Sequence, residues 1–218
     1  MQETQAEALA AVAALDEPTR RRLYEYVVRC PEPVSRDDVA AALGVPRATV
    51  AFHLDRLVDE RLLAVGHERR TGRTGPGAGR PAKLYRRSDR QVSVSLPERQ
   101  YELAGRLLAT AVEEAGETGG SPREILMRCA RERGAELAAG APEILGTLEE
   151  HGFEPRVEDG EVLLGNCPFH RLAVTHTRLV CEMNLGLVEG MLDAVGDRAL
   201  RARLDPHPGF CCVRLARD

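Results

Sequence analysis

The sequence lacks the features that mark secreted and membrane proteins. No apolar run in its 218 residues approaches the roughly 18–20 residues that a transmembrane helix requires. The N-terminus, Met1-Gln2-Glu3-Thr4, is polar and acidic and has no basic segment before an apolar stretch, so no signal peptide is expected. We therefore predict a cytoplasmic protein without membrane association. In that compartment the six cysteines are better explained as metal ligands, redox groups or buried packing residues than as a disulfide framework.

Excess basic charge is absent from most of the chain and concentrated in one segment. The chain has 43% apolar residues, which is typical of a folded globular protein, and a formal net charge of −4. Between residues 61 and 90, nine Lys and Arg residues stand against two acidic ones, so this segment carries +7 and the rest of the chain −11. A basic island in an acidic protein indicates binding of a polyanion.

The first 95 residues predict short helices followed by a hairpin. After a first helix ending near Leu15, Asp16 is the candidate N-cap of a second helix. Ser35 and Asp38 form a capping-box pattern at the start of a third helix, which Gly44 ends. A fourth helix then opens at Pro46, with apolar residues along one face.

Two strands, expected at residues 62–65 and 83–86, flank a Gly- and Arg-rich tip at residues 71–80. Helix, glycine turn, helix and basic hairpin is the plan of a winged helix-turn-helix domain. The fourth helix would enter the major groove of double-stranded operator DNA, which is about 12 Å wide, and the wing arginines would reach phosphates or the minor groove. The predicted DNA contacts are Arg47, Thr49, Phe52, His53, Arg56, Arg69, Arg70, Arg73, Arg80 and Lys83.

Two stretches of this region resemble the ArsR/MarR-like winged-helix regulators. They are Leu-Gly-Val-Pro-Arg-Ala-Thr-Val-Ala-Phe-His-Leu-Asp-Arg-Leu at 43–57 and Gly-Arg-Pro-Ala-Lys-Leu-Tyr-Arg at 79–86. They are similar to the recognition helix and the second wing strand of that family, and the resemblance covers residues 5–90. It implies a DNA-binding regulator that works as a homodimer.

A longer helix beginning at Pro97 carries an apolar stripe from Tyr101 to Ala115. The stripe suits packing against a partner helix or against its own domain, and the pattern alone does not separate the two. The family resemblance favours a dimerisation helix. Residues 116–120 are the expected linker to a second domain.

The remaining residues predict a small α+β domain. Ser121 and Glu124 suggest another capping box, and Asp159-Gly160 is a hairpin signal between two strands. The predicted fold class is therefore mainly α with an α+β part, in three segments. These are a winged helix-turn-helix domain at 1–95, a dimerisation helix with linker at 96–120 and a sensor domain at 121–218.

Cysteines and histidines cluster in this last segment. Cys167 and His170 form a Cys-x-x-His pair within one turn, and Cys181 follows 14 residues after Cys167. A terminal strand from residue 211 could return Cys211 or Cys212 to the same place. Because side chains alternate along a strand, only one of that pair should face the site, and Cys211 is favoured. The predicted metal ligands are therefore Cys167, His170, Cys181 and Cys211, with Cys212 as the alternate.

Other interpretations of the cysteines stay open. Cys30 and Cys129, which lie alone in apolar helical patterns, are expected to be packing residues. The same ligands could hold one structural zinc ion in a domain that senses a small apolar molecule. An enzyme with Cys167 as nucleophile and His170 as base is disfavoured, because no orienting acid or oxyanion loop is evident.

The C-terminal half also resembles the sensor domain of the iron–sulfur assembly (Suf operon) repressors and related actinobacterial regulators. The matching residues are Asn-Cys-Pro-Phe-His at 166–170, Cys181 and the terminal Cys211-Cys212, and the resemblance covers residues 121–218. It implies an iron–sulfur cluster that changes operator affinity. Its ligands would be Cys167, Cys181 and Cys211 or Cys212, with His170 as a candidate fourth. The cofactor expected first is thus an iron–sulfur cluster, and zinc is the alternative.

Overall fold

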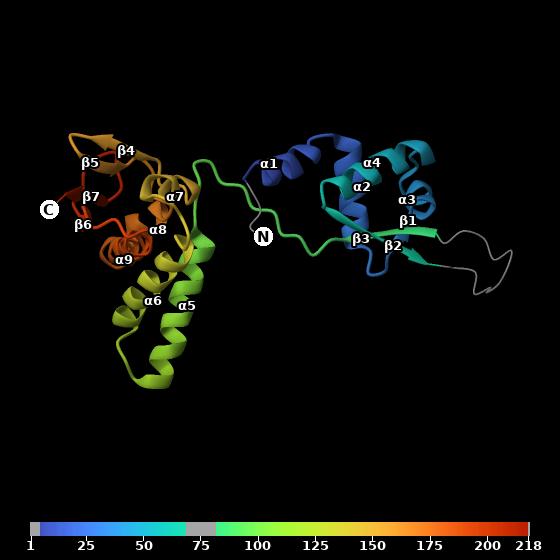
Figure 1. The fold of residues 1–218 in the computed structure, drawn as a ribbon. Helices are drawn as coiled ribbons and strands as arrows, with labels where there is room; N and C mark the ends of the chain where they lie inside the picture. Colours follow the sequence, from blue (N-terminus) through green and yellow to red (C-terminus); the bar gives the residue numbers. More distant parts are fainter. Residues whose placement is uncertain (1–4, 69–81, 218) are drawn as a thin grey trace. The chain divides into compact units, whose positions relative to one another are not determined.

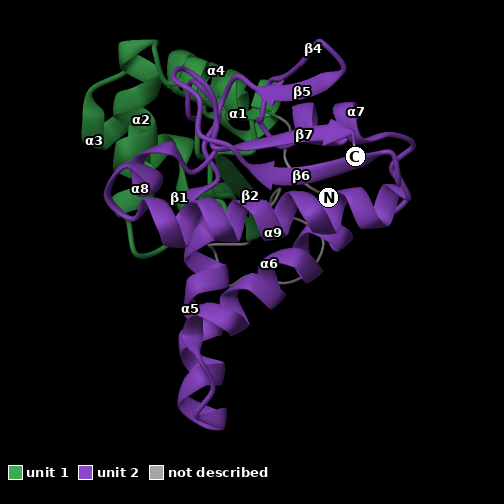
Figure 2. Ribbon diagram, turned by 90° about the vertical axis from the view of Figure 1, so that its left-hand side faces the viewer, with its two compact units in different colours: residues 1–94 green, residues 95–218 purple. Residues whose placement is uncertain are grey.

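The computed structural model describes residues 5–68 and 82–217 (Figure 1). The chain divides into an N-terminal unit, residues 1–94, and a C-terminal unit, residues 95–218, coloured separately in Figure 2. The predicted fold class is confirmed. A mostly helical chain carries an N-terminal helix-turn-helix with a wing hairpin, followed by helices and a four-stranded antiparallel sheet.

Among its described residues, 5–68 and 82–94, the N-terminal unit contains four helices and a three-stranded sheet. Its elements are α1 (Gln5–Ala14), α2 (Pro18–Arg29), β1 (Val34–Ser35), α3 (Arg36–Leu43), α4 (Arg47–Asp59), β2 (Leu63–Glu68) and β3 (Ala82–Arg87). The sheet has the order β1-β3-β2, and both pairings are antiparallel. Buried Leu54 and Leu57 of α4 share one core with Tyr85 of β3, so the helices and the hairpin fold as one body.

Local capping sets the helix boundaries of this unit. The predicted capping box is present, because the Ser35 hydroxyl accepts from the Asp38 N–H and the Asp38 carboxylate accepts from the Ser35 N–H. Gly44 ends α3 in the left-handed conformation, with φ of 64°, which glycine adopts without a Cβ penalty. The predicted N-cap of α2 was wrong by one residue. Glu17, not Asp16, accepts the N–H groups of Thr19 and Arg20, because α2 begins at Pro18 and Glu17 therefore occupies the N-cap position.

The C-terminal unit contains five helices and a four-stranded sheet among its described residues. Its elements are α5 (Tyr101–Thr118), α6 (Pro122–Leu137), α7 (Ile144–Glu150), β4 (Pro155–Glu158), β5 (Glu161–Leu164), α8 (His170–Thr175), α9 (Thr177–Val195), β6 (Leu200–Leu204) and β7 (Val213–Arg217). The sheet order is β4-β5-β7-β6, and every neighbouring pair is antiparallel. Asp159 and Gly160 turn β4 into β5 with φ of 50° and 82°, as the hairpin signal predicts. Ser121 does cap α6, but its side chain makes no capping hydrogen bond, so the second capping box is not formed.

Helices α6 and α9 cross at glycine contacts. A Cβ on Gly134 would lie 1.9 Å from the carbonyl oxygen of Leu187, and one on Gly190 would lie 1.9 Å from that of Arg131. Only glycine lets the two backbones approach this closely. This contact fixes α9, which carries Cys181.

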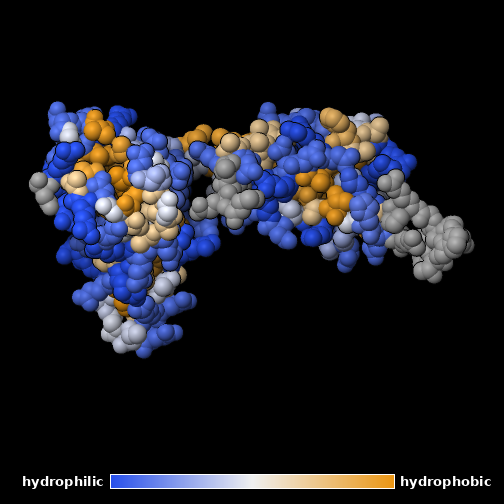
Figure 3. All heavy atoms as spheres, viewed as in Figure 1, coloured by the Kyte–Doolittle hydropathy of each residue, from blue (hydrophilic) through white to orange (hydrophobic). Residues whose placement is uncertain are grey.

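Helix α5 packs on α6 along one side only. Ala104, Leu107 and Ala111 are buried, whereas Val112 is 64% exposed. Hydrophilic residues cover most of the visible face of the α5–α6 hairpin (Figure 3). The apolar stripe therefore packs within its own unit, and Val112 remains exposed. No helix among the described residues is long and apolar enough to cross a membrane.

Candidate functional site

The exposed face of α4 is the candidate nucleic-acid surface of the N-terminal unit. Helices α3 and α4 are joined by a tight turn at Gly44, and buried Val50, Leu54 and Leu57 hold α4 against the core. On the opposite side, Phe52 is 68% exposed. An aromatic ring so exposed on this helix is available for apolar contact with base edges, such as thymine methyl groups.

Two predicted DNA-contacting arginines on α4 already have carboxylate partners. Arg47 lies 2.5 Å from Asp37 of α3, and Arg56 lies 2.6 Å from Glu60 one turn later. Both arginines are more than half exposed, so phosphate oxygens can compete with these carboxylates in water. The pairs keep the arginines ordered over the surface that DNA would meet.

His53 and Lys83 tie elements of the N-terminal unit together. His53 Nδ1 lies 3.5 Å from the Glu17 carboxylate, so this half-buried ring faces α2. Lys83 of β3 forms an ion pair with Asp55 of α4, and the Tyr85 hydroxyl donates to the same carboxylate at 3.0 Å. Partial burial acts to raise the pKa of Asp55, but the hydrogen bonds from Lys83 and Tyr85 outweigh it and hold that pKa below its ordinary value. The ionised Asp55 thereby fixes the wing strand against the recognition helix.

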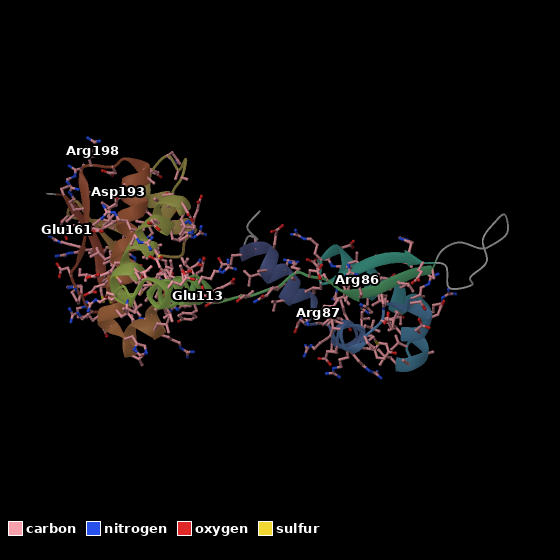
Figure 4. All side chains as sticks on the ribbon, turned by 90° about the horizontal axis from the view of Figure 1, so that it is seen from below. Arg86, Arg87, Glu113, Glu161, Asp193 and Arg198 are labelled. Carbon is pink, nitrogen blue, oxygen red and sulfur yellow. The ribbon has the colours of Figure 1, made fainter. Side chains whose placement is uncertain are left out.

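The remaining predicted DNA contacts divide between described and undescribed residues. Thr49 is half-buried on α4. Arg86 and Arg87, which were not among the predicted contacts, are exposed at the end of β3 (Figure 4). The wing arginines Arg69, Arg70, Arg73 and Arg80 lie outside the described residues.

Four cysteines meet in the C-terminal unit. Cys167 lies in the loop between β5 and α8, Cys181 in the first turns of α9, and Cys211 and Cys212 just before β7. The thiol of Cys167 is hydrogen-bonded to that of Cys211, and the thiol of Cys181 to that of Cys212. The backbone N–H of Cys211 donates to the carbonyl of Leu164 at 2.9 Å, which holds the terminal segment beside the Cys167 loop.

The expectation that only one vicinal cysteine could face the others was wrong. It assumed that a strand begins at residue 211, but β7 begins at Val213. Cys211 and Cys212 lie in a bend before the ladder, where strict alternation of side chains does not apply. Both thiols therefore contact a partner in the cluster.

His170 lies apart from the thiols. It is the first residue of α8 and is exposed, although its N–H donates to the Cys167 carbonyl at 3.0 Å. Within the described residues, no side-chain hydrogen bond or ion pair joins His170 to the cysteines. The helix turns its imidazole outward, which the Cys-x-x-His spacing alone could not reveal.

The cluster stabilises one thiolate and disfavours the others. A hydrogen bond with Cys211, the Phe169 N–H and the positive charge of Arg99 lower the pKa of Cys167 to about 7, against the effect of burial. The same hydrogen bond and burial raise the pKa of Cys211 far above its ordinary value. The Cys167–Cys211 pair therefore loses one proton near neutral pH and keeps the second. Burial and the bond with Cys212 raise the pKa of Cys181 to about 12.

Asn184 is a buried amide directed at the cluster from α9. It is 1% exposed, and its Nδ2 donates to Cys211 Sγ at 3.2 Å. Its Oδ1 is buried without a hydrogen-bond partner. An unpaired buried amide oxygen costs free energy, so its position beside four thiols calls for an explanation.

The thiols meet as two pairs rather than around one point. Across residues 5–68 and 82–217, no group of three or more Cys, His, Asp and Glu side chains has the arrangement of a metal site. Cys129, by contrast, is buried in α6 among apolar residues of the core. Cys30 is the C-cap of α2, and its thiol lies 3.4 Å from the Tyr26 carbonyl.

Comparison with known protein families identifies the N-terminal unit. Residues 15–66 match a helix-turn-helix domain. The match begins just before α2 and ends within β2, so it contains the whole α3–Gly44–α4 segment. Comparison with curated proteins and with solved structures gives no significant match. A helix-turn-helix domain indicates a DNA-binding transcriptional regulator rather than an enzyme.

Two residues that bear on the cysteine cluster were not predicted from the sequence. Arg99 and Asn166 bind the Cys167 loop, as described below. Arg99 belongs to no predicted motif, and Asn166 is only the first residue of the resemblance at 166–170. Asn166 directly precedes Cys167, which was the one signal available. Arg99 lies 68 positions earlier, and only the folded chain brings it to the loop.

Proposed function

We propose that this chain is a homodimeric transcriptional repressor. Its operator affinity is set by an iron–sulfur cluster, or by zinc, that Cys167, Cys181, Cys211 and Cys212 hold. The gathering of these four cysteines as two thiol pairs in one part of the C-terminal unit carries the proposal. The helix-turn-helix match, the exposed α4 face and the +7 segment at residues 61–90 support the DNA-binding part. Val112 of α5 is 64% exposed and available to a partner helix, and together with the family resemblance of residues 5–90 it supports the dimer.

The donor set fits a soft metal centre. Four cysteines are the ligands of structural zinc sites and of [2Fe–2S] and [4Fe–4S] clusters, and no hard oxygen ligand is needed. Asn184 also fits, because its Nδ2 donates to Cys211 Sγ, and a hydrogen bond to a ligand sulfur stabilises the thiolate form. Relative to the sequence-based expectation, the set replaces His170 by Cys212. When bound, the group would join the Cys167 loop, α9 and the terminal segment through its sulfur ligands. It would supply a positive charge there, and a cluster would also supply a redox-active centre.

The chain's own residues favour the thiolate form that such binding requires. The Phe169 N–H and the Arg99 guanidinium favour the charge on Cys167, and Asn184 Nδ2 donates toward Cys211. Hydrogen bonds to ligand sulfurs stabilise thiolates and tune the bound centre. Binding must replace the S–H···S bonds of the two pairs, so it should reorganise the loops that carry them.

Anaerobic purification followed by metal and sulfide analysis tests the proposal. A brown protein with visible absorbance, iron and sulfide would identify a cluster, and a colourless protein with about one zinc per chain would identify zinc. Removal of either by chelator should change DNA affinity by about tenfold. The proposed sensing would be contradicted by a protein that binds neither a cluster nor zinc after reconstitution. It would also be contradicted by a DNA affinity that does not change on chelator treatment.

Phe52→Glu is expected to abolish specific DNA binding, because it places a carboxylate on the exposed face of α4 against phosphates and base edges. Phe52 is 68% exposed, so folding should be unaffected. Val157→Glu, at a 62% exposed position on β4, is the matched control and should bind DNA like the wild type. Fluorescence anisotropy with a duplex selected by the protein from a random library measures both. Unchanged binding by Phe52→Glu would exclude α4 as the recognition helix.

A further inference from the structure

Asn166 joins the Cys167 loop to the beginning of the C-terminal unit. This side chain is 6% exposed, and its Nδ2 donates to the carbonyls of Gly152 at 2.6 Å and Glu98 at 3.0 Å. Its Oδ1 accepts a hydrogen bond from Arg99. Both donor hydrogens and the acceptor of the amide are thus used, which fixes its orientation.

Arg99 adds further hydrogen bonds at the same junction, and we call the contact of residues 98–100 with residues 166–168 the clasp. Its Nη1 donates to Asn166 Oδ1 and, at 3.2 Å, to the carbonyl of Cys167 itself. One residue further on, the Gln100 N–H donates to the carbonyl of Pro168 at 3.0 Å. Residues 98–100 are therefore bonded to residues 166–168 through side chains and backbone together.

Close packing supports the clasp. A Cβ on Gly152 would lie 2.9 Å from Cβ of Glu98, so glycine is needed for the Glu98 segment to sit this close. Gly152 also has φ of 77°, which glycine adopts readily. The chain is thus shaped to hold residues 98–100 against the Cys167 loop.

The chain just before this clasp is anchored in the other unit. Arg90 binds the carbonyls of Glu60 and Glu7, and the Ser88 hydroxyl donates to the Arg61 carbonyl at 2.7 Å. Val92 packs against the core of the helix-turn-helix unit. Residues 93–97 form the covalent tether between these anchors and the clasp.

We propose that the clasp of Arg99 and Asn166 is the relay between the cysteine cluster and the DNA-binding unit. This inference rests on the proposed function. Rearrangement of Cys167 on metal binding or loss moves its carbonyl, and Arg99 carries that displacement to residues 98–100. From there it passes to the tether and into α5. Arg99 is a positioning residue, because it reaches Cys167 through a carbonyl and a charge and not as a ligand.

Arg99→Met is the central test, because it keeps the length of the side chain and removes its hydrogen bonds to Asn166, to the Cys167 carbonyl and to the Glu98 carbonyl. Wild type and variant are reconstituted anaerobically with iron and sulfide, and separately with Zn²⁺, and are then stripped by chelator. Affinity for the selected duplex is measured in each state. The wild-type affinity should change by about tenfold, and the variant's by less than about twofold. Loss of the positive charge beside Cys167 should weaken metal binding, so the variant is loaded at saturating metal, where it should bind DNA like the stripped wild type.

Arg106→Met is the matched control. Arg106 lies on α5, is exposed and pairs with Glu102 at 2.5 Å, away from the cysteines, so its variant should keep the full metal response. A second readout does not depend on any variant folding. In the wild type, hydrogen exchange of the amides of residues 98–104 should change on metal removal.

The outcomes separate the relay from the proposed function. Arg99→Met with an intact metal response, or residues 98–104 with unchanged exchange while DNA affinity responds, would overturn the relay alone. A wild type that binds metal without any change in DNA affinity would overturn the sensing function and the relay with it. Loss of response in Arg99→Met with retained metal supports the relay. A merely structural role for Arg99 would instead prevent metal loading even at saturating metal.

Discussion

Cys181→Ser is expected to remove metal binding, so that the DNA affinity of the variant is the same with and without chelator. Cys181 is buried on α9, and its thiol contacts that of Cys212. A serine hydroxyl is a hard, weakly acidic donor that does not replace a thiolate toward zinc or iron–sulfur centres. Metal content should fall from about one centre per chain to near zero, and an approximately tenfold chelator response should vanish. Cys167→Ser should behave in the same way.

Two other cysteines provide controls for this experiment. Cys30→Ser changes a half-buried cap of α2 in the other unit, and Cys129→Ala changes a packing residue of α6. Both variants should keep the metal and the response. His170→Ala separates the sequence-based ligand set from the structural one, because His170 is exposed and should be dispensable. Full metal content in the Cys181 and Cys167 variants would mean that the cysteines are packing residues.

The helix-turn-helix unit could be predicted because its signals are local. A capping box needs residues three positions apart, and a left-handed helix end needs one glycine at one position. Ser35 and Gly44 act in the structure as the sequence indicates. The one error, Asp16 for Glu17, has the same local origin, since two adjacent acidic residues both offered a carboxylate to the first turn of α2.

The cysteine cluster could be predicted only in outline. Composition placed four cysteines in one segment, but which side chains meet depends on where β7 begins and which way α8 turns. A start at Val213 frees Cys212 from strand alternation, and the first turn of α8 directs His170 to solvent. Arg99 joins the site only through tertiary folding, and no residue pattern near it signals that role.

The role of α5 illustrates a different limit. Its apolar stripe was compatible with packing within its own unit or against a partner chain. In the structure one side of the helix is buried against α6, and Val112 is exposed. Periodicity reports how much of a helix is apolar and on which side. It does not identify what covers each part of that surface.

Gly190→Ala is expected to destabilise the C-terminal unit strongly. The added Cβ would lie 1.9 Å from the carbonyl oxygen of Arg131 and 2.9 Å from the Ala135 nitrogen, and both are backbone atoms of α6 that cannot rotate away. The two helices must separate, at a cost of about 3 kcal/mol. The melting transition of this unit should fall by about 10 °C, as measured by calorimetry.

The same substitution should also weaken metal binding, because α9 carries Cys181 and Asn184 on the helix that Gly190 docks. Gly105→Ala is the control, since Gly105 lies within α5 with open space at its Cβ position. It should raise stability by about 0.5–1 kcal/mol, the helix preference of alanine over glycine. If Gly190→Ala melted like the wild type, the close approach of α6 and α9 would not exist. If it melted early yet kept its metal, the position of α9 would not control the cluster, and the binding of Cys181 would depend on local structure alone.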